Sequence, residues 1–370
     1  MLKQRRYDLD WLRVISVFAV FLHHVLMPFN GDDFHIMNKT YSKILDDTMV
    51  YFEQFRLPLL FFISGVGTIF AFSKRSWFSF IKERMLRLLI PLIFGVLFII
   101  PPQTFFEYLD SYNSYLNAYP DLVLKFNVNH LWFIENLFLM SIVFIPFILF
   151  IRSNASIKLK KWIMNNTKKY GVISWVLVLL TIRLVTKEFF QSDSKSFFNP
   201  SSTLYFGFFF LSGIVITSTG DLWKLLLNRR KFNFKLLIFF TILFYCYYFI
   251  PGNLIKPYVS LDNRWRLWYA ISSLVSWSAI ITILGYSQVF LNKKSELLSK
   301  LNEAVYPFYI LHQTIIIVLG YYIIRLEANI FSKIIILFTS SLILITLSYI
   351  LLIYPFKWIR FLFGMKNKKI

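Results

Sequence analysis

The chain has 370 residues, of which 57% are hydrophobic and 20% are aromatic, and its formal net charge is +21. This composition excludes an ordinary soluble domain, and the repeated apolar runs of about twenty residues predict a polytopic membrane protein. The basic residues cluster between the apolar runs, which argues against nucleic-acid binding and is typical of cytoplasmic loops. The single cysteine, Cys246, excludes an intrachain disulfide, and its apolar surroundings predict a buried, unreactive thiol.

Ten apolar segments predict an all-α polytopic membrane protein, a bundle of about ten transmembrane helices. In chain order the predicted spans are Leu9–Met27, Met49–Phe72, Leu86–Phe106, Leu131–Ile151, Tyr170–Phe190, Thr203–Thr219, Phe234–Ile250, Leu267–Leu291, Val305–Ile324 and Ile330–Tyr354. Placing both termini in the cytoplasm puts most Lys and Arg on the inner side. No small-residue cleavage site follows the first run, so we expect that run to be retained. Without a repeat or a soluble region, residues 1–370 are expected to form one membrane domain.

The first predicted span carries Asp10, Arg13, His23 and His24 inside an otherwise apolar run. Ionisable groups at membrane depth usually face a bundle interior or a water-filled cavity. At about 100° per residue, Asp10, Arg13 and His24 share one helix face, whereas His23 points elsewhere. An imidazole in such a stripe can take a proton from a hydroxyl. Pairing between Asp10 and Arg13 would stabilise the buried cation.

Two further patterns lie near the second and third predicted spans. The small residues Ser64, Gly65 and Gly67 indicate close helix packing, and the missing first glycine argues against a nucleophile elbow. Arg84 and Arg87 are three residues apart, so they share a helix face at the predicted cytoplasmic mouth. Two guanidiniums there could bind phosphate groups, or they could snorkel as ordinary positive-inside residues. Their spacing leaves both alternatives open.

Polar residues also mark the fourth and ninth predicted spans. The outer segment that ends at His130 is rich in Tyr and Asn, which suits either sugar binding or an interfacial aromatic belt. On one helix His130 and Glu135 would face different ways, so they do not predict an acid–base dyad. Glu135 is expected to face a cavity or a cation. His312 is either a hydrogen-bonded packing residue or a catalyst, and no cluster has the spacing of a metal site.

Five short motifs resemble those of the acyltransferase-three family of integral membrane acyltransferases. They are the stretch from Asp10 to His24, FFISG at Phe61 to Gly65, Arg84-x-x-Arg87-Leu88 ending at Pro91, HLWF at His130 to Phe133, and YILHQ at Tyr309 to Gln313. Each motif is weak alone, but their order and spacing match across nearly the whole chain. The sequence is most similar to the branch that contains glucans biosynthesis protein C.

This resemblance implies an enzyme that moves an acetyl or succinyl group from a cytoplasmic acyl-CoA to a hydroxyl of an extracytoplasmic glycan or glycolipid. The resemblance carries the catalytic role to His24, a supporting role to Arg13 and donor-side roles to Arg84 and Arg87, and Glu135 is the nearest candidate for an acid in the fourth span. Beside these we predict Asp10 as a member of the catalytic group, Ser64 as a donor-binding residue, and His130 and His312 as supporting residues. The family also implies the inner membrane of a bacterium as location, with no tightly bound cofactor and no metal.

Two other function classes remain open at this stage. A transporter or flippase for a glycan or lipid would also place charges within the membrane. It would favour inverted repeats, and the sequence shows no convincing repeat. A non-catalytic membrane scaffold would leave the ionisable stripe of the first span unexplained.

Overall fold

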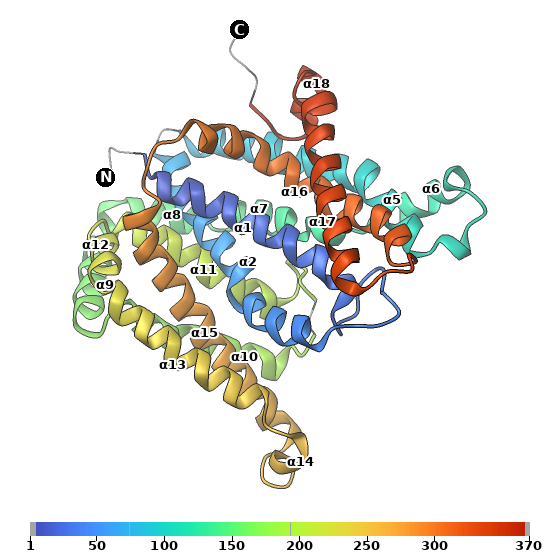
Figure 1. The fold of residues 1–370 in the computed structure, drawn as a ribbon. Coiled ribbons are helices and arrows are strands. Elements are labelled where there is room, and N and C mark those ends of the chain that lie inside the picture. Colours follow the sequence, from blue (N-terminus) through green and yellow to red (C-terminus); the bar gives the residue numbers. More distant parts are fainter. Residues whose placement is uncertain (1–4, 74, 193, 367–370) are drawn as a thin grey trace. The chain divides into compact units, whose positions relative to one another are not determined.

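The computed structural model describes residues 5–73, 75–192 and 194–366, and regular structure in these ranges is entirely helical (Figure 1). The prediction of an all-α protein is therefore confirmed. The α-helices are α1 (Tyr7–Leu26), α2 (Lys43–Phe72), α3 (Trp77–Arg84), α4 (Ile90–Phe94), α5 (Ile100–Glu107), α6 (Tyr115–Leu124), α7 (Trp132–Val143), α8 (Ile145–Arg152), α9 (Ile157–Tyr170), α10 (Val176–Phe189), α11 (Pro200–Ser218), α12 (Leu222–Asn228), α13 (Arg230–Tyr248), α14 (Gly252–Ile255), α15 (Leu261–Phe290), α16 (Glu296–Ile323), α17 (Ile330–Leu347) and α18 (Lys357–Leu362). Three further segments, Met85–Leu89, Gly95–Ile99 and Ser348–Ile353, are wound as π-helix.

Within the described ranges, seven helical stretches are long and apolar enough to cross a bilayer. They are Tyr7–Phe29, Lys43–Phe72, Trp77–Glu107, Pro200–Ser218, Leu261–Phe290, Glu296–Ile323 and Ile330–Ile353. The bent pair Tyr115–Val143 and Ile145–Arg152 would add an eighth if it forms one span. The polytopic membrane character is thus confirmed, whereas the count of about ten spans is not.

Two predicted spans, Tyr170–Phe190 and Phe234–Ile250, do not form helices that are long and apolar enough to cross a bilayer. The reason differs between them. Helix α10 has 14 residues, which cover only about 21 Å of a hydrocarbon core about 30 Å thick. Helix α13 has 19 residues, but Arg230, Lys231 and Lys235 lie near its start and lower its apolar content. A continuous apolar run in the sequence therefore does not ensure one straight membrane helix.

The chain divides into two compact units, each assembled from segments that are far apart in the sequence. The first unit comprises Met1–Arg13, Glu53–Ser76 and Met140–Lys294, and the second comprises Val14–Phe52, Trp77–Leu139 and Ser295–Ile370. Helices α1 and α2 each contribute one end to each unit.

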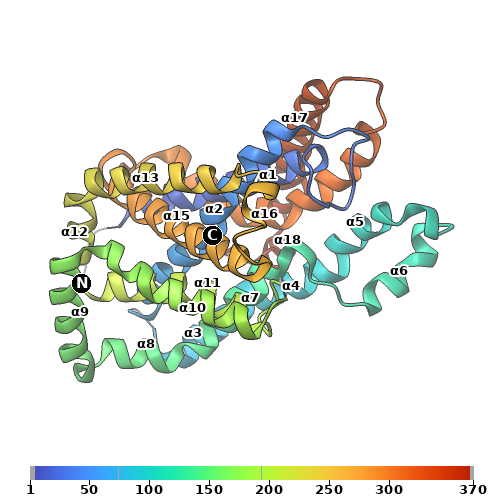
Figure 2. The ribbon, with the colours of Figure 1, turned by 90° about the horizontal axis from the view of Figure 1, so that it is seen from below.

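Helix α15 is central to the first unit, where it packs against α10, α12 and α13. Figures 1 and 2 both show α13 and α15 side by side. Helices α2 and α11 cross at two glycines. A Cβ atom at Gly65 would lie 2.0 Å from the carbonyl oxygen of Phe210, and one at Gly213 would lie 2.2 Å from that of Phe62. The packing role predicted for the small-residue patch is therefore confirmed at Gly65.

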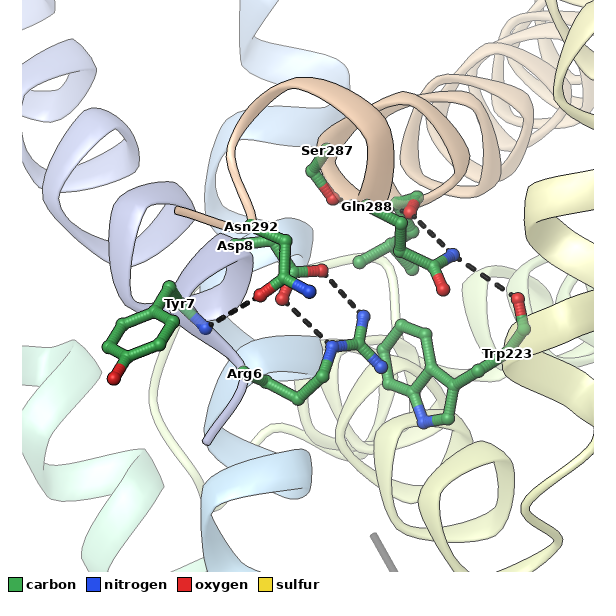
Figure 3. A network of polar contacts seen from close by, with 8 residues as sticks. Arg6, Tyr7, Asp8, Trp223, Ser287, Gln288 and Asn292 are labelled. Atoms are coloured by element: carbon green, nitrogen blue, oxygen red, sulfur yellow. Dashed lines mark hydrogen bonds and ion pairs between the residues drawn. The ribbon is translucent and has the colours of Figure 1, made fainter. Parts of the chain in front are cut away.

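A polar network anchors the start of α1 within the first unit (Figure 3). Asp8 is fully buried and accepts hydrogen bonds of 2.5 and 2.8 Å from the Arg6 guanidinium. The guanidinium carbon of Arg6 also lies 4.0 Å from the centre of the Trp223 ring. The backbone N–H of Tyr7 donates to Oδ1 of Asn292 at 3.1 Å. These contacts tie the first turn of α1 to α12 and to the segment after α15.

The core of the second unit forms where α1 meets α16 and α17. Its fully or nearly fully buried members are Phe21, Val25, Phe29, Ile316, Ile323, Leu337 and Ile345. Helix α16 also packs against α5. The α17 stretch is only 17% buried, so its remaining apolar surface is suited to contact with lipid.

Cys246 is exposed on α13, so the prediction of a buried thiol is wrong. Helix α13 buries Phe244 instead. Two residues further along, the helix has turned by about 200°, which points the thiol away from that buried face.

Candidate active site

His24 of α1 and His312 of α16 are in direct contact within the second unit. Nδ1 of His24 lies 2.8 Å from Nε2 of His312, and the two ring planes differ by only 11°. Nearly parallel rings at this nitrogen–nitrogen distance form an in-plane N–H···N hydrogen bond. The two residues are 288 positions apart in sequence, so the fold alone brings them together.

The hydrogen-bond partners determine which nitrogen of each neutral ring carries the proton. Nδ1 of His312 lies 2.5 Å from the carbonyl oxygen of Tyr309, which can only accept, so this Nδ1 is protonated. Nε2 of His312 is then the acceptor, and Nδ1 of His24 donates to it. In neutral His24 the ring lone pair is consequently on Nε2. A backbone carbonyl and one imidazole thus orient a second imidazole, as the third group of a catalytic triad orients its base.

His130 holds the part of α16 that carries His312. Its Nε2–H donates to the carbonyl oxygen of Ile310 at 3.0 Å, and the Tyr309 hydroxyl donates back to the His130 carbonyl at 2.5 Å. The His130 ring meets the His312 ring edge-on, with centres 5.4 Å apart. These contacts make His130 a residue that positions α16.

A second polar group, which sequence reasoning missed, lies next to the histidine pair in the second unit. The Gln313 amide nitrogen lies 3.0 Å from Nε2 of His35 and 2.9 Å from Oδ1 of Asn129. Because the amide donates to Nε2, Nδ1–H of His35 donates to Oε2 of Glu107 at 2.6 Å. Gln313 follows His312 directly, and its place in the YILHQ motif was the available signal. His35 lies in an irregular loop, where no helical period could indicate its partner.

The other residues predicted for the polar stripe are arranged differently. Asp10 pairs with Arg5 at 2.8 Å, so the predicted Asp10–Arg13 pair is not observed. The partly buried Arg13 makes no hydrogen bond or ion pair with the described residues. Eleven residues of α1 separate Arg13 from His24, about 16 Å along the axis, so they occupy different depths. Arg5 lies before the helix and forms an ion pair with the Asp10 carboxylate in place of Arg13.

Glu135 lies on α7 in the second unit, and Ser64 lies on α2 in the first unit. Glu135 is partly buried on α7, and no hydrogen bond or ion pair links it to the described part of the chain. Of the two alternatives predicted for Glu135, a cation or a cavity, an ion pair with a cation is not observed among the described residues. Ser64 is partly buried on α2, where its backbone carbonyl accepts a hydrogen bond from Thr68 at 2.9 Å.

Arg84 and Arg87 lie at the junction of α3 and the π-helical segment Met85–Leu89. The Arg84 guanidinium lies 4.6 Å from the centre of the Phe80 ring. Nε of Arg87 lies 3.2 Å from Oε1 of Glu83. The two arginines are therefore held by aromatic and acidic neighbours rather than splayed outward.

In the second unit, one face of α16 carries buried polar atoms that have no hydrogen-bond partner among the described residues, and Tyr306 on this face lies close to the Arg87 backbone. A Cβ atom at Gly364 would lie 2.8 Å from both the Arg87 carbonyl and the Tyr306 ring, so all three meet there. The Tyr306 hydroxyl and both amide atoms of Asn302 are buried without a hydrogen-bond partner among the described residues. Asn302 and Tyr306 are four residues apart on α16, so they share one face. The sequence analysis did not predict either residue, because uncharged polar residues are common near the end of a membrane helix.

A family model described as an acyltransferase domain matches residues 6–354 of the chain. The chain belongs to the acyltransferase-three family. It is therefore a membrane acyltransferase of the kind that transfers groups other than amino-acyl groups. The match identifies the family and not the branch suggested by the motifs. No curated protein and no solved structure matches the chain.

No group of three or more His, Cys, Asp or Glu in the described ranges is arranged to hold a metal ion. An imidazole oriented like that of His24 can take up a proton, and the polar groups next to it can form hydrogen bonds.

Proposed function

We propose that this acyltransferase moves an acetyl or succinyl group from a cytoplasmic acyl-CoA to a hydroxyl of an extracytoplasmic glycan or glycolipid in the bacterial inner membrane. The observation that carries the proposal is the His24–His312 pair, held in plane by the Tyr309 carbonyl. A base oriented in this way, within a membrane acyltransferase, is suited to activate an acceptor hydroxyl.

The proposed reaction uses Nε2 of His24 as general base. The acceptor oxygen attacks the thioester carbonyl carbon while its proton moves to Nε2. Collapse of the tetrahedral intermediate breaks the carbon–sulfur bond and leaves the ester on the acceptor. His24 then returns the proton to the departing thiolate, which leaves as the free thiol of CoA. His312 accepts the hydrogen bond from Nδ1 throughout and stabilises the imidazolium that forms.

The donor side of the proposal rests on the second unit's polar cluster. The phosphates of CoA are dense in charge, and Arg84 and Arg87 supply guanidiniums that bind phosphate well. The unpartnered polar atoms of Asn302 and Tyr306 would gain partners from the same ligand.

The test is acyl transfer to glycan in membranes, normalised to folded protein, with His24→Gln and His23→Gln compared. Gln keeps a polar side chain of similar reach but cannot take a proton at neutral pH. His24→Gln is expected to lose about a hundredfold to ten-thousandfold in rate, the usual contribution of a positioned base. His23→Gln is the matched control and should keep most of the activity.

Near-normal transfer by His24→Gln together with an inactive His23→Gln would overturn the assignment. Wild-type protein that binds and translocates a glycan, but transfers no acyl group, would favour the transporter alternative instead.

A further inference from the structure

The C-terminal segment, residues 357–366, packs in the second unit against the cluster proposed to bind the donor. It comprises α18 and the turn after it, in which Gly364 has a φ of +65°. A Cβ atom at Gly364 would lie 2.8 Å from the Arg87 carbonyl oxygen and from the Tyr306 ring, and 2.9 Å from Pro91. The segment is therefore in direct contact both with the third predicted span and with α16.

One face of the C-terminal segment is buried, and the other is open. The buried face carries Phe363, which is 3% exposed and meets the Phe94 ring edge-on with centres 5.3 Å apart. Arg360 lies one helical turn before Phe363 and is buried on the same face. Trp358, by contrast, is 79% exposed. The segment thus turns a cation and an aromatic ring toward the interior of the second unit.

Arg360 is a buried cation that uses only part of its hydrogen-bonding capacity. It is 4% exposed, and its Nη2 donates to Oε1 of Glu303 at 2.8 Å and to the Lys366 carbonyl at 2.9 Å. Its Nη1 is buried and has no hydrogen-bond partner among the described residues. A buried charged donor without a partner costs free energy. An anchoring role through Glu303 accounts for Nη2 but leaves Nη1 unexplained.

Three further buried polar atoms lie where α16 meets this segment. They are Nδ2 and Oδ1 of Asn302 and the hydroxyl of Tyr306, and none has a hydrogen-bond partner in the described part of the chain. Glu303, which binds Arg360, directly follows Asn302, and Gly364 lies against the Tyr306 ring. Buried polar groups without partners are few in native proteins. Their concentration here favours a polar ligand that enters between the segment and α16.

The predicted topology places this segment on the side of the membrane from which the donor comes. Basic residues between the apolar runs put the C-terminus in the cytoplasm. A guanidinium is well suited to bind phosphate, and a CoA molecule carries several phosphates.

We propose that the C-terminal segment is a lid of the donor site and that Arg360 binds a phosphate of the acyl-CoA through its unpartnered Nη1. The lid lifts to admit the donor, because the polar atoms beneath it are enclosed. The identity of the donor rests on the proposed function, whereas the lid and its phosphate contact do not.

The first experiment measures calorimetric binding of CoA and of 3′-dephospho-CoA to the purified full chain. Arg360→Gln should weaken CoA binding about tenfold or more, and Arg360→Lys should recover part of it because the charge is kept. Glu303→Gln is the matched control, since it breaks the same ion pair but keeps the arginine, and it should bind CoA at least as tightly as the wild type. A loss for CoA alone assigns the contact to the 3′-phosphate, and a loss for both ligands assigns it to the diphosphate. Unchanged binding in Arg360→Gln, or equal losses in Arg360→Gln and Glu303→Gln, would overturn the phosphate contact.

The second experiment measures movement of the lid by maleimide labelling in a Cys246→Ser background. Phe363→Cys places the thiol on the buried face, so labelling requires the lid to lift, and saturating CoA should slow it about threefold or more. Trp358→Cys is the control on the exposed face and should react rapidly with or without CoA. Labelling at position 363 that is as fast as at position 358, or that bound CoA does not slow, would overturn the lid.

Inorganic pyrophosphate separates a failure of the lid from a failure of the proposed function. If the wild type binds no CoA, while pyrophosphate slows labelling at position 363 only when Arg360 is present, the donor assignment is wrong and the lid stands. If the wild type and Arg360→Gln bind CoA equally, and CoA does not slow labelling at position 363, the lid is wrong and the proposed donor stands.

Discussion

At the scale of single residues, one backbone carbonyl determines where the protons lie in the proposed site. The Tyr309 carbonyl fixes the proton on Nδ1 of His312, and the remaining nitrogen orients His24. His312 is therefore a positioning residue, because it acts on the acceptor only through His24. The Tyr309 carbonyl is part of the α16 backbone. His130 binds this backbone one residue further on, at the carbonyl of Ile310.

We expect the side chain at position 312 to matter as a hydrogen-bond acceptor. His312→Phe removes the acceptor for Nδ1–H of His24 and should reduce kcat by about tenfold to a hundredfold, the equivalent of about 1.5–3 kcal/mol. His312→Gln supplies an amide oxygen in its place and should retain most of that activity. The measurement is steady-state transfer with kcat and KM separated. Equal activity in the two variants would argue that His312 is a packing residue.

Tyr306 and Tyr309 offer a matched pair of buried hydroxyls on α16. The Tyr306 hydroxyl has no partner among the described residues, whereas that of Tyr309 donates to the His130 carbonyl. Tyr306→Phe should raise the free energy of unfolding by about 1 kcal/mol and weaken acyl-CoA binding. Tyr309→Phe should lower the free energy of unfolding by about 1–3 kcal/mol, because it leaves a buried carbonyl unpaired. Thermal unfolding in detergent and acyl-CoA titration check both; unchanged donor affinity in Tyr306→Phe would remove Tyr306 from the donor site.

At the scale of helices, two nearby glycines of α2 should respond in opposite ways to the same substitution. A Cβ atom at Gly65 would strike the Phe210 carbonyl, so Gly65→Ala should destabilise the fold by about 1–3 kcal/mol or more. At Gly67 the nearest heavy atom to a Cβ is Nη2 of Arg13 at 4.0 Å, an ordinary contact. Gly67→Ala should therefore be neutral or stabilising by up to about 1 kcal/mol, because alanine favours helix. Thermal unfolding of the two variants measures both changes in stability. Equal changes would contradict the close crossing of α2 and α11.

At the scale of the whole molecule, the charge distribution predicts the orientation in the membrane. In a Cys246→Ser background, Lys161→Cys should be labelled only from the cytoplasm and Asp33→Cys only from outside. The background is needed because Cys246 is exposed. Membrane-impermeant maleimide applied to whole cells and to inverted vesicles makes the comparison. Labelling of Asp33→Cys only from the cytoplasmic side would reverse the predicted topology.

The sequence by itself determined the fold class and the family of this protein, and it predicted His24 and His312 as candidate site residues. Apolar runs and basic loops identify membrane helices because bilayer thickness and charge asymmetry act on local sequence. Motif order over the whole chain identified the family, which the match to residues 6–354 confirms. The helical period also predicted that His24 and His23 lie on different faces of the first helix, because this prediction requires only the geometry of a single helix.

Only the tertiary structure decided which of these residues meet. The helical period predicts which residues share one face of a helix, but it does not predict which other helix packs against that face. The contact between His24 and His312 could therefore not be predicted from residue spacing. The Glu107–His35 pair joins a helix end to an irregular loop, for which no helical period could indicate the partner. Asp10 pairs with Arg5, which precedes α1, instead of with Arg13 inside the helix. Local sequence thus determines which helices form, whereas long-range packing determines which residues contact one another.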